Sequence, residues 1–133
     1  MAIEDPWEKA KSLHNLGAAY YGMNEMQKAT DLLNEALDLR ELHQDLEGQA
    51  ETLLYIGYVN HAVKNVPAAE QYYQRSLNLW QAAKNPRGRA LTLTSLGHIS
   101  NISGERQRAL EYYDQALQIF QILGDLSGRC SVM

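Results

Sequence analysis

The sequence predicts an all-α fold in which three helix–turn–helix repeats stack into a solenoid. The first observation is self-similarity, because equivalent residues recur forty positions apart along a chain of 133 residues. The second is that long stretches lack proline and carry apolar residues at three- and four-residue steps, the spacing of a half-buried helix. Repeats of this length bury their apolar faces against their neighbours and so form elongated stacks. The forty-residue series are Leu16-Gly17, Ile56-Gly57 and Leu96-Gly97; Ala29, Ala69 and Ala109; Leu37, Leu77 and Leu117; and Gly48, Gly88 and Gly128.

The first helix of each repeat has a recognisable start. Asp5 can accept hydrogen bonds from free helix amides, and Pro6 suits the first helical position. Asn85-Pro86 repeats this pair, and Asp45 and Asp125 stand at equivalent places. We therefore expect a single domain over residues 1–133, with repeats at about 5–44, 45–84 and 85–124 and a partial helix or frayed tail at 125–133 that opens a fourth repeat.

A glycine lies in the middle of each first helix, at Gly17, Gly57 and Gly97. Glycine inside a helix costs about 1 kcal/mol relative to alanine. Its recurrence at one position indicates that the paired helix packs there too closely for a Cβ atom.

The second helix of each repeat follows a short turn. Asn24, Lys64 and Gly104 occupy the same turn position, and because Asn and Gly tolerate a left-handed backbone, Lys64 forms the weakest turn. The second helices are expected to begin near Glu25, Val66 and Glu105. Polar connectors are expected at Gln44-Asp45, Lys84-Asn85 and Gly124-Asp125.

The order of residue types within a repeat is also distinctive. The first repeat reads Leu13, Leu16-Gly17, Tyr20, Ala29, Leu33 and Ala36, and the other two keep most of this pattern. The pattern resembles tetratricopeptide repeats of a longer-spaced variety, over about residues 6–124, although Asn60 and Ser100 replace the usual tyrosine and the terminal proline is absent. The longer form is similar to arrays in cell-polarity adaptors, kinesin light chains and bacterial signalling proteins. We therefore expect a right-handed α-solenoid that acts as a protein–protein interaction scaffold.

The resemblance implies that the first helices line a concave groove. Tyrosine and histidine offer a wide contact area with a polar tip, so we expect a peptide or partner helix to bind there; alternatively, some of these tyrosines pack between repeats. The residues expected in the groove are Lys11, His14 and Tyr21 in the first repeat, Glu51, Tyr55, Tyr58 and His61 in the second, and Thr94, His98 and Asn101 in the third. The family's cationic clamp for a peptide carboxylate is not matched, because its positions hold His14, Ala18, Tyr55, Leu91 and Ser95.

Charge and composition argue against several functions. The net charge of −4 does not suit general binding to the nucleic-acid backbone, so no nucleic-acid partner is expected. No run of eighteen apolar residues could span a membrane, so no membrane partner is expected either. The single cysteine, Cys130, fits a reducing compartment, and with no secretory leader in the first thirty residues we expect a cytoplasmic location.

No constellation for catalysis or for a cofactor is found, so we expect no enzyme activity and no metal. His61 and His98 lie on successive first helices and could approach each other, but no two histidines have the i, i+4 spacing of a helical zinc pair. The glycines are spaced at forty residues rather than clustered in a phosphate loop. An enzyme or metal-binding protein remains the remote alternative.

The C-terminal end of the stack suggests a second kind of contact. An apolar face formed by the last second helix lacks a complete successor repeat; its residues are Leu110, Tyr113, Leu117 and Phe120. We expect either that the chain is a regulatory module of a larger signalling protein or that it forms a homo-oligomer through this face. Residues 1–44 carry a net charge of −4 and residues 85–133 carry +1, which favours head-to-tail stacking over a two-fold dimer.

Overall fold

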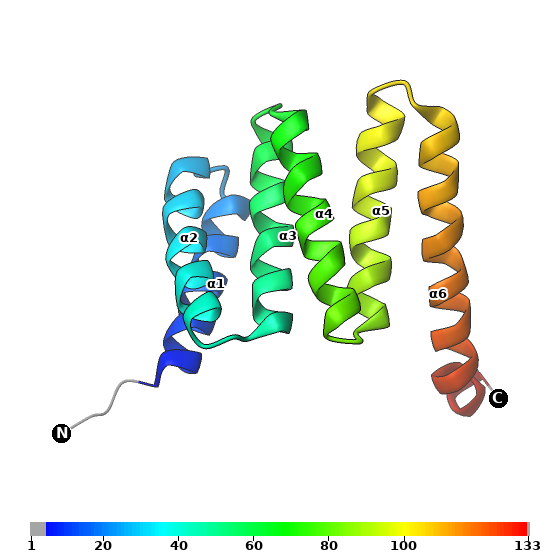
Figure 1. Ribbon diagram of the computed structural model, residues 1–133, viewed down its shortest axis with the longest axis horizontal. Helices are drawn as coiled ribbons and strands as arrows, with labels where there is room; N and C mark the ends of the chain where they lie inside the picture. Colours follow the sequence, from blue (N-terminus) through cyan, green and yellow to red (C-terminus); the bar gives the residue numbers. More distant parts are fainter. Residues whose placement is uncertain (1–4, 133) are drawn as a thin grey trace.

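Six helices make up the described part of the chain, and no strand occurs within it. The computed structural model describes the backbone of residues 5–132 and the side chains of residues 5–124. The helices are α1 (Pro6–Gly22), α2 (Met26–Leu42), α3 (Leu46–Ala62), α4 (Val66–Ala82), α5 (Pro86–Ile102) and α6 (Arg106–Val132). They stand in a row, each running opposite to the one before it (Figure 1).

Packing follows the order of the chain. Within the repeats, α1 packs on α2, α3 on α4 and α5 on α6, while α2 contacts α3 and α4 contacts α5 between repeats. Consecutive first helices also touch, α1 with α3 and α3 with α5. The predicted all-α solenoid of three helix–turn–helix repeats is therefore confirmed.

Helix starts and turns follow the predicted chemistry. Oδ1 of Asp45 accepts a hydrogen bond from the Gly48 amide, and Oδ1 of Asn85 accepts one from the Gly88 amide, both at 3.0 Å. The turn residue Gly104 has a φ of +87°, and Lys64 has a φ of +66° although its side chain disfavours that region.

The mid-helix glycines lie where the prediction requires close packing. A Cβ atom at Gly97 would stand 2.8 Å from Cδ1 of Tyr113, and one at Gly17 would stand 2.9 Å from Cγ of Leu33. A Cβ atom at Gly57 would collide with the ring of Tyr73. The close contact inferred from the glycine spacing is confirmed.

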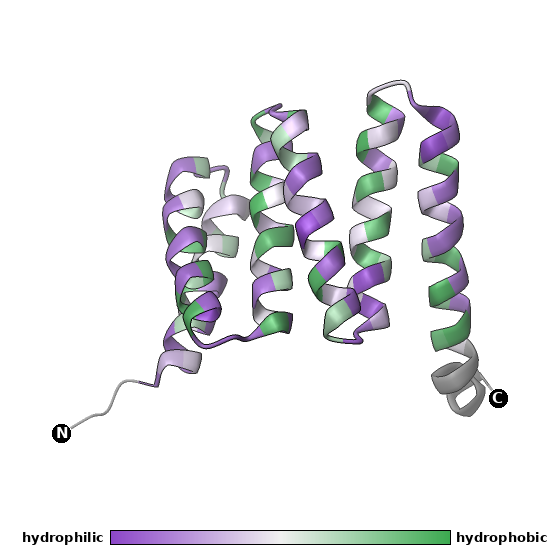
Figure 2. Cartoon of the chain, in the orientation of Figure 1, coloured by the Kyte–Doolittle hydropathy of each residue, from purple (hydrophilic) through white to green (hydrophobic). Residues whose placement is uncertain are grey.

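The core is divided between two clusters that meet at α3. Leu53 and Ile56 belong to the cluster shared with α2, whereas Leu54 belongs to the cluster shared with α4, α5 and α6. Figure 2 shows hydrophobic residues gathered on α3 and α5, while α2 and the first half of α6 are largely hydrophilic. The middle repeat thus supplies side chains to both cores.

The connector expected at Gly124-Asp125 is not formed. Helix α6 continues through both residues to Val132, whereas the equivalent connectors leave the helix through a positive φ at Gln44 and Lys84. At those connectors a following first helix packs against the preceding one, and the described chain has no such helix after α6. Without that contact, the local helical hydrogen bonds persist.

Candidate functional site

Aromatic rings from α1 and α3 join into a continuous cluster on the face formed by the first helices. We define the aromatic cluster as His14, Tyr21, Tyr55 and Tyr58. The centroids of Tyr55 and Tyr58 lie 5.1 Å apart, and those of His14 and Tyr55 lie 4.8 Å apart in an edge-to-face arrangement. Tyr21 stacks on Tyr58 with a centroid separation of 6.1 Å, which links α1 to α3 directly.

A second pair of rings links α3 to α5. The imidazole centroids of His61 and His98 lie 5.2 Å apart. They border a hollow of about 250 Å³ whose other walls are the side chains of Tyr58, Tyr73, Thr94, Ser95 and Tyr113. This hollow contains hydroxyl and imidazole groups but no carboxylate or amine, so it suits apolar groups or neutral hydrogen-bonding groups.

His14, the buried member of the aromatic cluster, belongs to a polar network between α1, α2 and α3. His14 is 3% exposed, and its Nδ1 lies 3.1 Å from Oγ1 of Thr52. Arg40 is buried as well, and its Nη1 donates to Oγ1 of Thr52 at 2.8 Å, to the Gly48 carbonyl at 3.1 Å and to Oε1 of Glu51 at 3.2 Å. Side-chain hydrogen bonds of this network thus connect α1, α2 and α3.

Burial sets the ionisation of these groups. It lowers the pKa of His14, an effect opposed by Glu51 and reinforced by Arg40. It also lowers the pKa of His61, with a smaller contribution in the same direction from His98. Burial raises the pKa of Tyr58 and of Tyr73. Neutral imidazoles and neutral phenols are therefore favoured at neutral pH.

The structure places the ten predicted groove residues at different depths. The buried residue is His14, and the half-buried ones are Tyr21, Tyr55, Tyr58 and His61. The exposed ones are Lys11, Glu51, Thr94, His98 and Asn101. Two groups form, the aromatic cluster and the His61–His98 pair, and both pack between first helices as well as presenting a surface. Among the described residues, neither Lys11 nor Asn101 joins these two groups through a ring contact or an ion pair. Binding by the set stays a prediction.

Three contributing residues were missed from the sequence: Arg40, Thr52 and Ser95. Arg40 stands where the other repeats have Trp80 and Phe120, so a cation at a position of large apolar residues was the available signal. Thr52 carried no signal, because its role depends on partners from other helices. Ser95 had one, since it lies forty residues after the predicted groove residue Tyr55.

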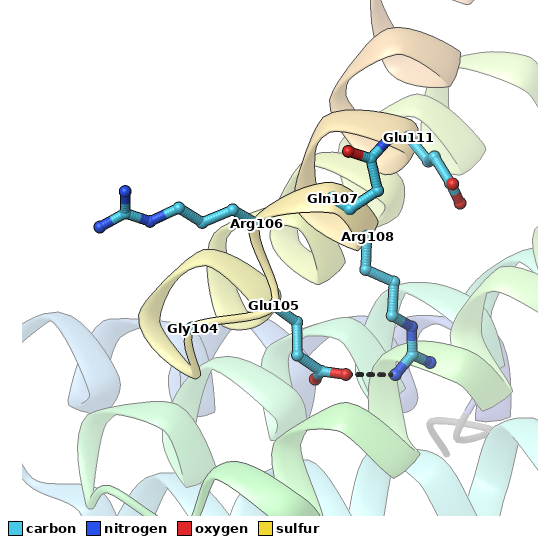
Figure 3. A pocket seen from close by; sticks show the side chains of 6 residues that line it. All are labelled: Gly104, Glu105, Arg106, Gln107, Arg108 and Glu111. Carbon is cyan, nitrogen blue, oxygen red and sulfur yellow. Dashed lines mark hydrogen bonds and ion pairs between the residues drawn. The ribbon is translucent and has the colours of Figure 1, made fainter.

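A separate hollow of about 550 Å³ opens at the turn between α5 and α6 (Figure 3). Nη1 of Arg108 is paired with Glu105 at 3.3 Å and lies 3.9 Å from a carboxylate oxygen of Glu70. The Arg106 side chain points away from that pair (Figure 3). With one arginine already engaged and the other directed elsewhere, this hollow presents no convergent set of groups.

The apolar face predicted on α6 is largely open. Leu110 is 61% exposed and Leu117 is 54% exposed, and Phe120 is exposed as well. Tyr113 instead turns toward α5 and lies against Gly97. The equivalents of Leu117 in the earlier repeats, Leu37 and Leu77, are buried.

Two classes of feature are absent from the described residues. No helix among them combines the length and apolar character needed to cross a bilayer. Within the same part of the chain, no three or more histidine, cysteine, aspartate or glutamate side chains gather in a way that could hold a metal ion.

Comparison with known proteins identifies a family. One family model described as tetratricopeptide repeat matches residues 48–122, and a second with the same description matches residues 10–43. No curated protein matches the chain in sequence.

Several solved structures share the fold. Aspartyl phosphate phosphatase F from Bacillus subtilis superposes with a TM-score of 0.87 at 20% identity, covering 93% of this chain and 33% of that one. The tetratricopeptide domain of Arabidopsis FLU gives a TM-score of 0.81 at 16% identity, covering 89% of this chain and 99% of that one. BtubC from P. vanneervenii gives a TM-score of 0.78 at 20% identity, covering 86% of this chain and 48% of that one. At such identities the likeness shows the fold, and this chain spans only about a third of the phosphatase F chain.

Proposed function

Because this chain belongs to the tetratricopeptide repeat family, we propose that it binds a peptide or a partner helix on the face formed by α1, α3 and α5. Families of this fold act as protein-binding scaffolds, and their function resides in the side chains that a surface displays rather than in the fold. The finer proposal concerns which face binds and with what chemistry.

The observation that carries the proposal is that ring contacts join each pair of consecutive first helices. Tyr21 and Tyr58 bridge α1 to α3, and His61 and His98 bridge α3 to α5. Tyr21, Tyr55 and Tyr58 remain half-exposed, so each keeps part of its ring available to a partner. Aromatic side chains with few rotatable bonds, fixed by their neighbours, lose little entropy when they bind.

The polar groups along this face favour a neutral segment. The hollow beside His61 and His98 displays hydroxyl and imidazole groups and no carboxylate or amine, and burial lowers the pKa of His61, which favours its neutral form. We therefore propose a ligand with an apolar or aromatic side chain flanked by amide or hydroxyl groups.

Selection from a displayed peptide library, followed by calorimetry of the selected peptides, tests this proposal. We expect Tyr55→Ala and His98→Ala each to weaken the selected peptides about tenfold or more, the loss typical of a central contact. Tyr72→Ala provides the matched control, since Tyr72 is a half-buried tyrosine on α4 outside this face. Equal losses in all three variants, with unchanged helicity, would assign binding to another surface.

We further propose that the open face of α6 packs against a second copy of the chain. This proposal is supported by Leu117, which is exposed, whereas Leu37 and Leu77 are buried in clusters with side chains of the next repeat. Sedimentation over a range of concentrations tests it, and a monomer at about 100 μM would contradict it. If association is seen, weakening by salt would favour head-to-tail stacking, which brings the acidic first repeat to the basic last one.

A second role is that of a regulatory module in a larger protein. The specific observation is that the chain spans only about a third of the aspartyl phosphate phosphatase chain with the same fold. Reading the coding sequence on both sides of this chain distinguishes a module from a free-standing adaptor.

A further inference from the structure

A hollow of about 240 Å³ lies where α2, α3 and α4 meet. We call it the junction hollow, and its walls are Met26, Gln27, Thr30, Asn34, Ile56, Val59, Asn60, Val63 and Tyr72. Asn60 follows Tyr58 by two residues, which is about half a turn of α3, so the hollow and the aromatic cluster lie on different sides of that helix. The binding face proposed above therefore does not include it.

The next junction of the stack, between α4, α5 and α6, shows how such a place is closed. There Nε2 of Gln74 donates to the hydroxyl of Tyr112 at 3.0 Å, which bridges α4 to α6. Forty residues earlier the equivalent pair is Asn34 and Tyr72. Asparagine is one methylene shorter than glutamine, and no hydrogen bond joins the side chains of these two described residues. The bridge is therefore missing at the junction hollow.

A second bridge is missing at the same place. Arg108 on α6 lies 3.9 Å from a carboxylate oxygen of Glu70 on α4. The equivalent residues of the earlier junction are Ala68 and Thr30, which cannot form an ion pair. Both connections that span the later junction are thus replaced by shorter, uncharged side chains, and the earlier junction stays open at these positions.

The walls of the junction hollow present polar groups that a ligand can reach. Nδ2 of Asn60 donates to the Ile56 carbonyl at 2.8 Å, which leaves Oδ1 of the same side chain available as an acceptor. The amide of Asn34 and the hydroxyl of Tyr72 form no hydrogen bond within the described part of the chain. Asn34 is exposed, and Asn60 and Tyr72 are half-buried, so all three side chains have accessible surface.

The remaining walls favour an uncharged, apolar body. Ile56 and Val59 are 2% and 3% exposed and form the floor, while Met26 is half-buried and Val63 is exposed at the rim. No charged side chain is among these walls. The thioether of a methionine makes favourable contacts with aromatic rings. A cavity of about 150 Å³ is large enough to bind benzene, so the hollow has room for one substituted ring.

The first repeat indicates that a ring fits this position. The equivalent of Asn60 there is Tyr20, whose ring packs against the hydrophobic cluster of α2 and α3. Nζ of Lys28 lies 5.3 Å from the centroid of that ring. Asn60 supplies an amide where the first repeat supplies a phenol, so the second repeat lacks a ring of its own.

We propose that the junction hollow receives the side chain of a tyrosine from a partner protein. The ring lies on Ile56 and Val59 beside Met26, and its hydroxyl donates to Oδ1 of Asn60. The amide of Asn34 binds the backbone of the same tyrosine. A charged side chain is disfavoured, because the walls offer it no opposite charge. This site goes beyond the proposed function and does not rest on it.

Methionine methyl NMR signals allow a direct test, since the chain has only four methionines and Met26 lies in the wall. Met26→Leu assigns its signal. The probes are N-acetyl-tyrosine methylamide, the matching phenylalanine and glutamate compounds, and p-cresol. We expect the tyrosine compound and p-cresol to shift the Met26 signal in a saturable way. The phenylalanine compound should bind about fivefold more weakly, because it lacks one hydrogen bond, and the glutamate compound should leave the signal unmoved.

Two variants close the hollow from within the chain. Asn60→Tyr supplies the missing ring and is expected to weaken the tyrosine compound at least about tenfold while the chain keeps its helicity. Asn34→Gln restores the reach of the Gln74–Tyr112 bridge and is expected to weaken binding about threefold. Gln74→Asn is the matched control, because it makes the reverse change at the other junction, and it should leave the Met26 titration unchanged.

Three results would overturn the inference: no Met26 shift with either phenol, an equal affinity for the glutamate compound, or undiminished binding in a folded Asn60→Tyr variant. If Asn60→Tyr does not fold, undiminished binding in Asn34→Gln has the same meaning. Binding of p-cresol without the tyrosine compound would overturn the assignment to a partner protein.

The two proposals fail separately. The readout here is the Met26 methyl group, so failure of this titration leaves the face formed by α1, α3 and α5 untouched as a binding surface. In the peptide selection, a loss confined to Tyr72→Ala would place the selected peptides in the junction hollow and would support this inference instead.

Discussion

The ring of Tyr73 on α4 lies so close to Gly57 on α3 that no side-chain atom could stand between them. Tyr73 is 1% exposed, and its ring also contacts Tyr58 with a centroid separation of 6.0 Å. A buried contact inside the second repeat therefore supports one of the rings on the proposed binding face. The same relationship recurs between Tyr113 and Gly97 in the third repeat.

Replacing Gly57 by alanine should destabilise the fold. The added methyl group would overlap the Tyr73 ring, at a cost of about 2 kcal/mol after the gain of about 1 kcal/mol in helix propensity is included. Urea denaturation followed by circular dichroism measures the change. Gly22→Ala is the control, because nothing lies within 4 Å of a Cβ atom there, and it should be neutral or stabilising. Equal stability of the two variants would contradict the packing argument.

Removing Arg40 should also destabilise the fold, through its partners. Arg40→Ala leaves the buried hydroxyl of Thr52 and the Gly48 carbonyl without their donor, and we expect a loss of about 3 kcal/mol in unfolding free energy. Arg75→Ala removes an exposed guanidinium that lies 3.8 Å from Glu41 and should cost less than about 1 kcal/mol. Thermal and urea unfolding of both variants tests the contrast, which fails if the two losses are similar.

Stability should fall as the pH is lowered below about 6.5. The folded pKa of His14 lies below its ordinary value of 6.5, so the unfolded chain binds more protons in this range, and stability rises with pH. The full stabilisation is present above the unfolded pKa and is lost progressively as pH falls toward the folded value. The lowered pKa of His61 acts in the same direction.

Urea midpoints measured at a series of pH values between about 7.5 and 5 check this sign. His14→Gln should flatten the profile in part, and the His14→Gln, His61→Gln double variant should flatten it further. A wild-type midpoint that rises on acidification would show that Glu51 outweighs burial at His14.

Equivalent leucines should differ in their contribution to stability. Leu77 is 9% exposed and Leu117 is 54% exposed at the same place in successive repeats. Leu77→Ala should cost about 2–3 kcal/mol, whereas Leu117→Ala should cost less than about 1 kcal/mol in dilute solution. If a second copy covers α6, the Leu117→Ala variant should instead lose association, which sedimentation would detect. Equal costs in dilute solution would show that another part of the chain already covers Leu117.

The fold was largely predictable because its determinants are local and repeated. Asp45 and Asn85 cap the starts of helices with their own side chains. Gly57 and Gly97, forty residues apart, lie where the paired helix packs too closely for a Cβ atom. The continuation of α6 through Gly124 was not predictable, since the other connectors depend on a following helix.

The candidate site was predicted only in outline. The approach of His61 to His98 follows from their places on successive first helices. The burial of His14 does not, because it depends on Thr52 in the next repeat and on the unusual cation Arg40. How deeply a side chain is buried depends on residues of the neighbouring repeats, so the sequence of one repeat does not determine it.

The position of α3 between the two core clusters governs how the chain comes apart. Leu53 and Ile56 face one cluster while Leu54 faces the other, so α3 leaves the fold only when both have opened. The helix pairs at the two ends can unfold locally and independently, because each contacts a neighbouring repeat on one side only, whereas α3 is held on both sides. Backbone amides of α3 should therefore be the last to exchange with deuterium. The tyrosines of α3, Tyr55 and Tyr58, should stay ordered while the ends of the stack fluctuate.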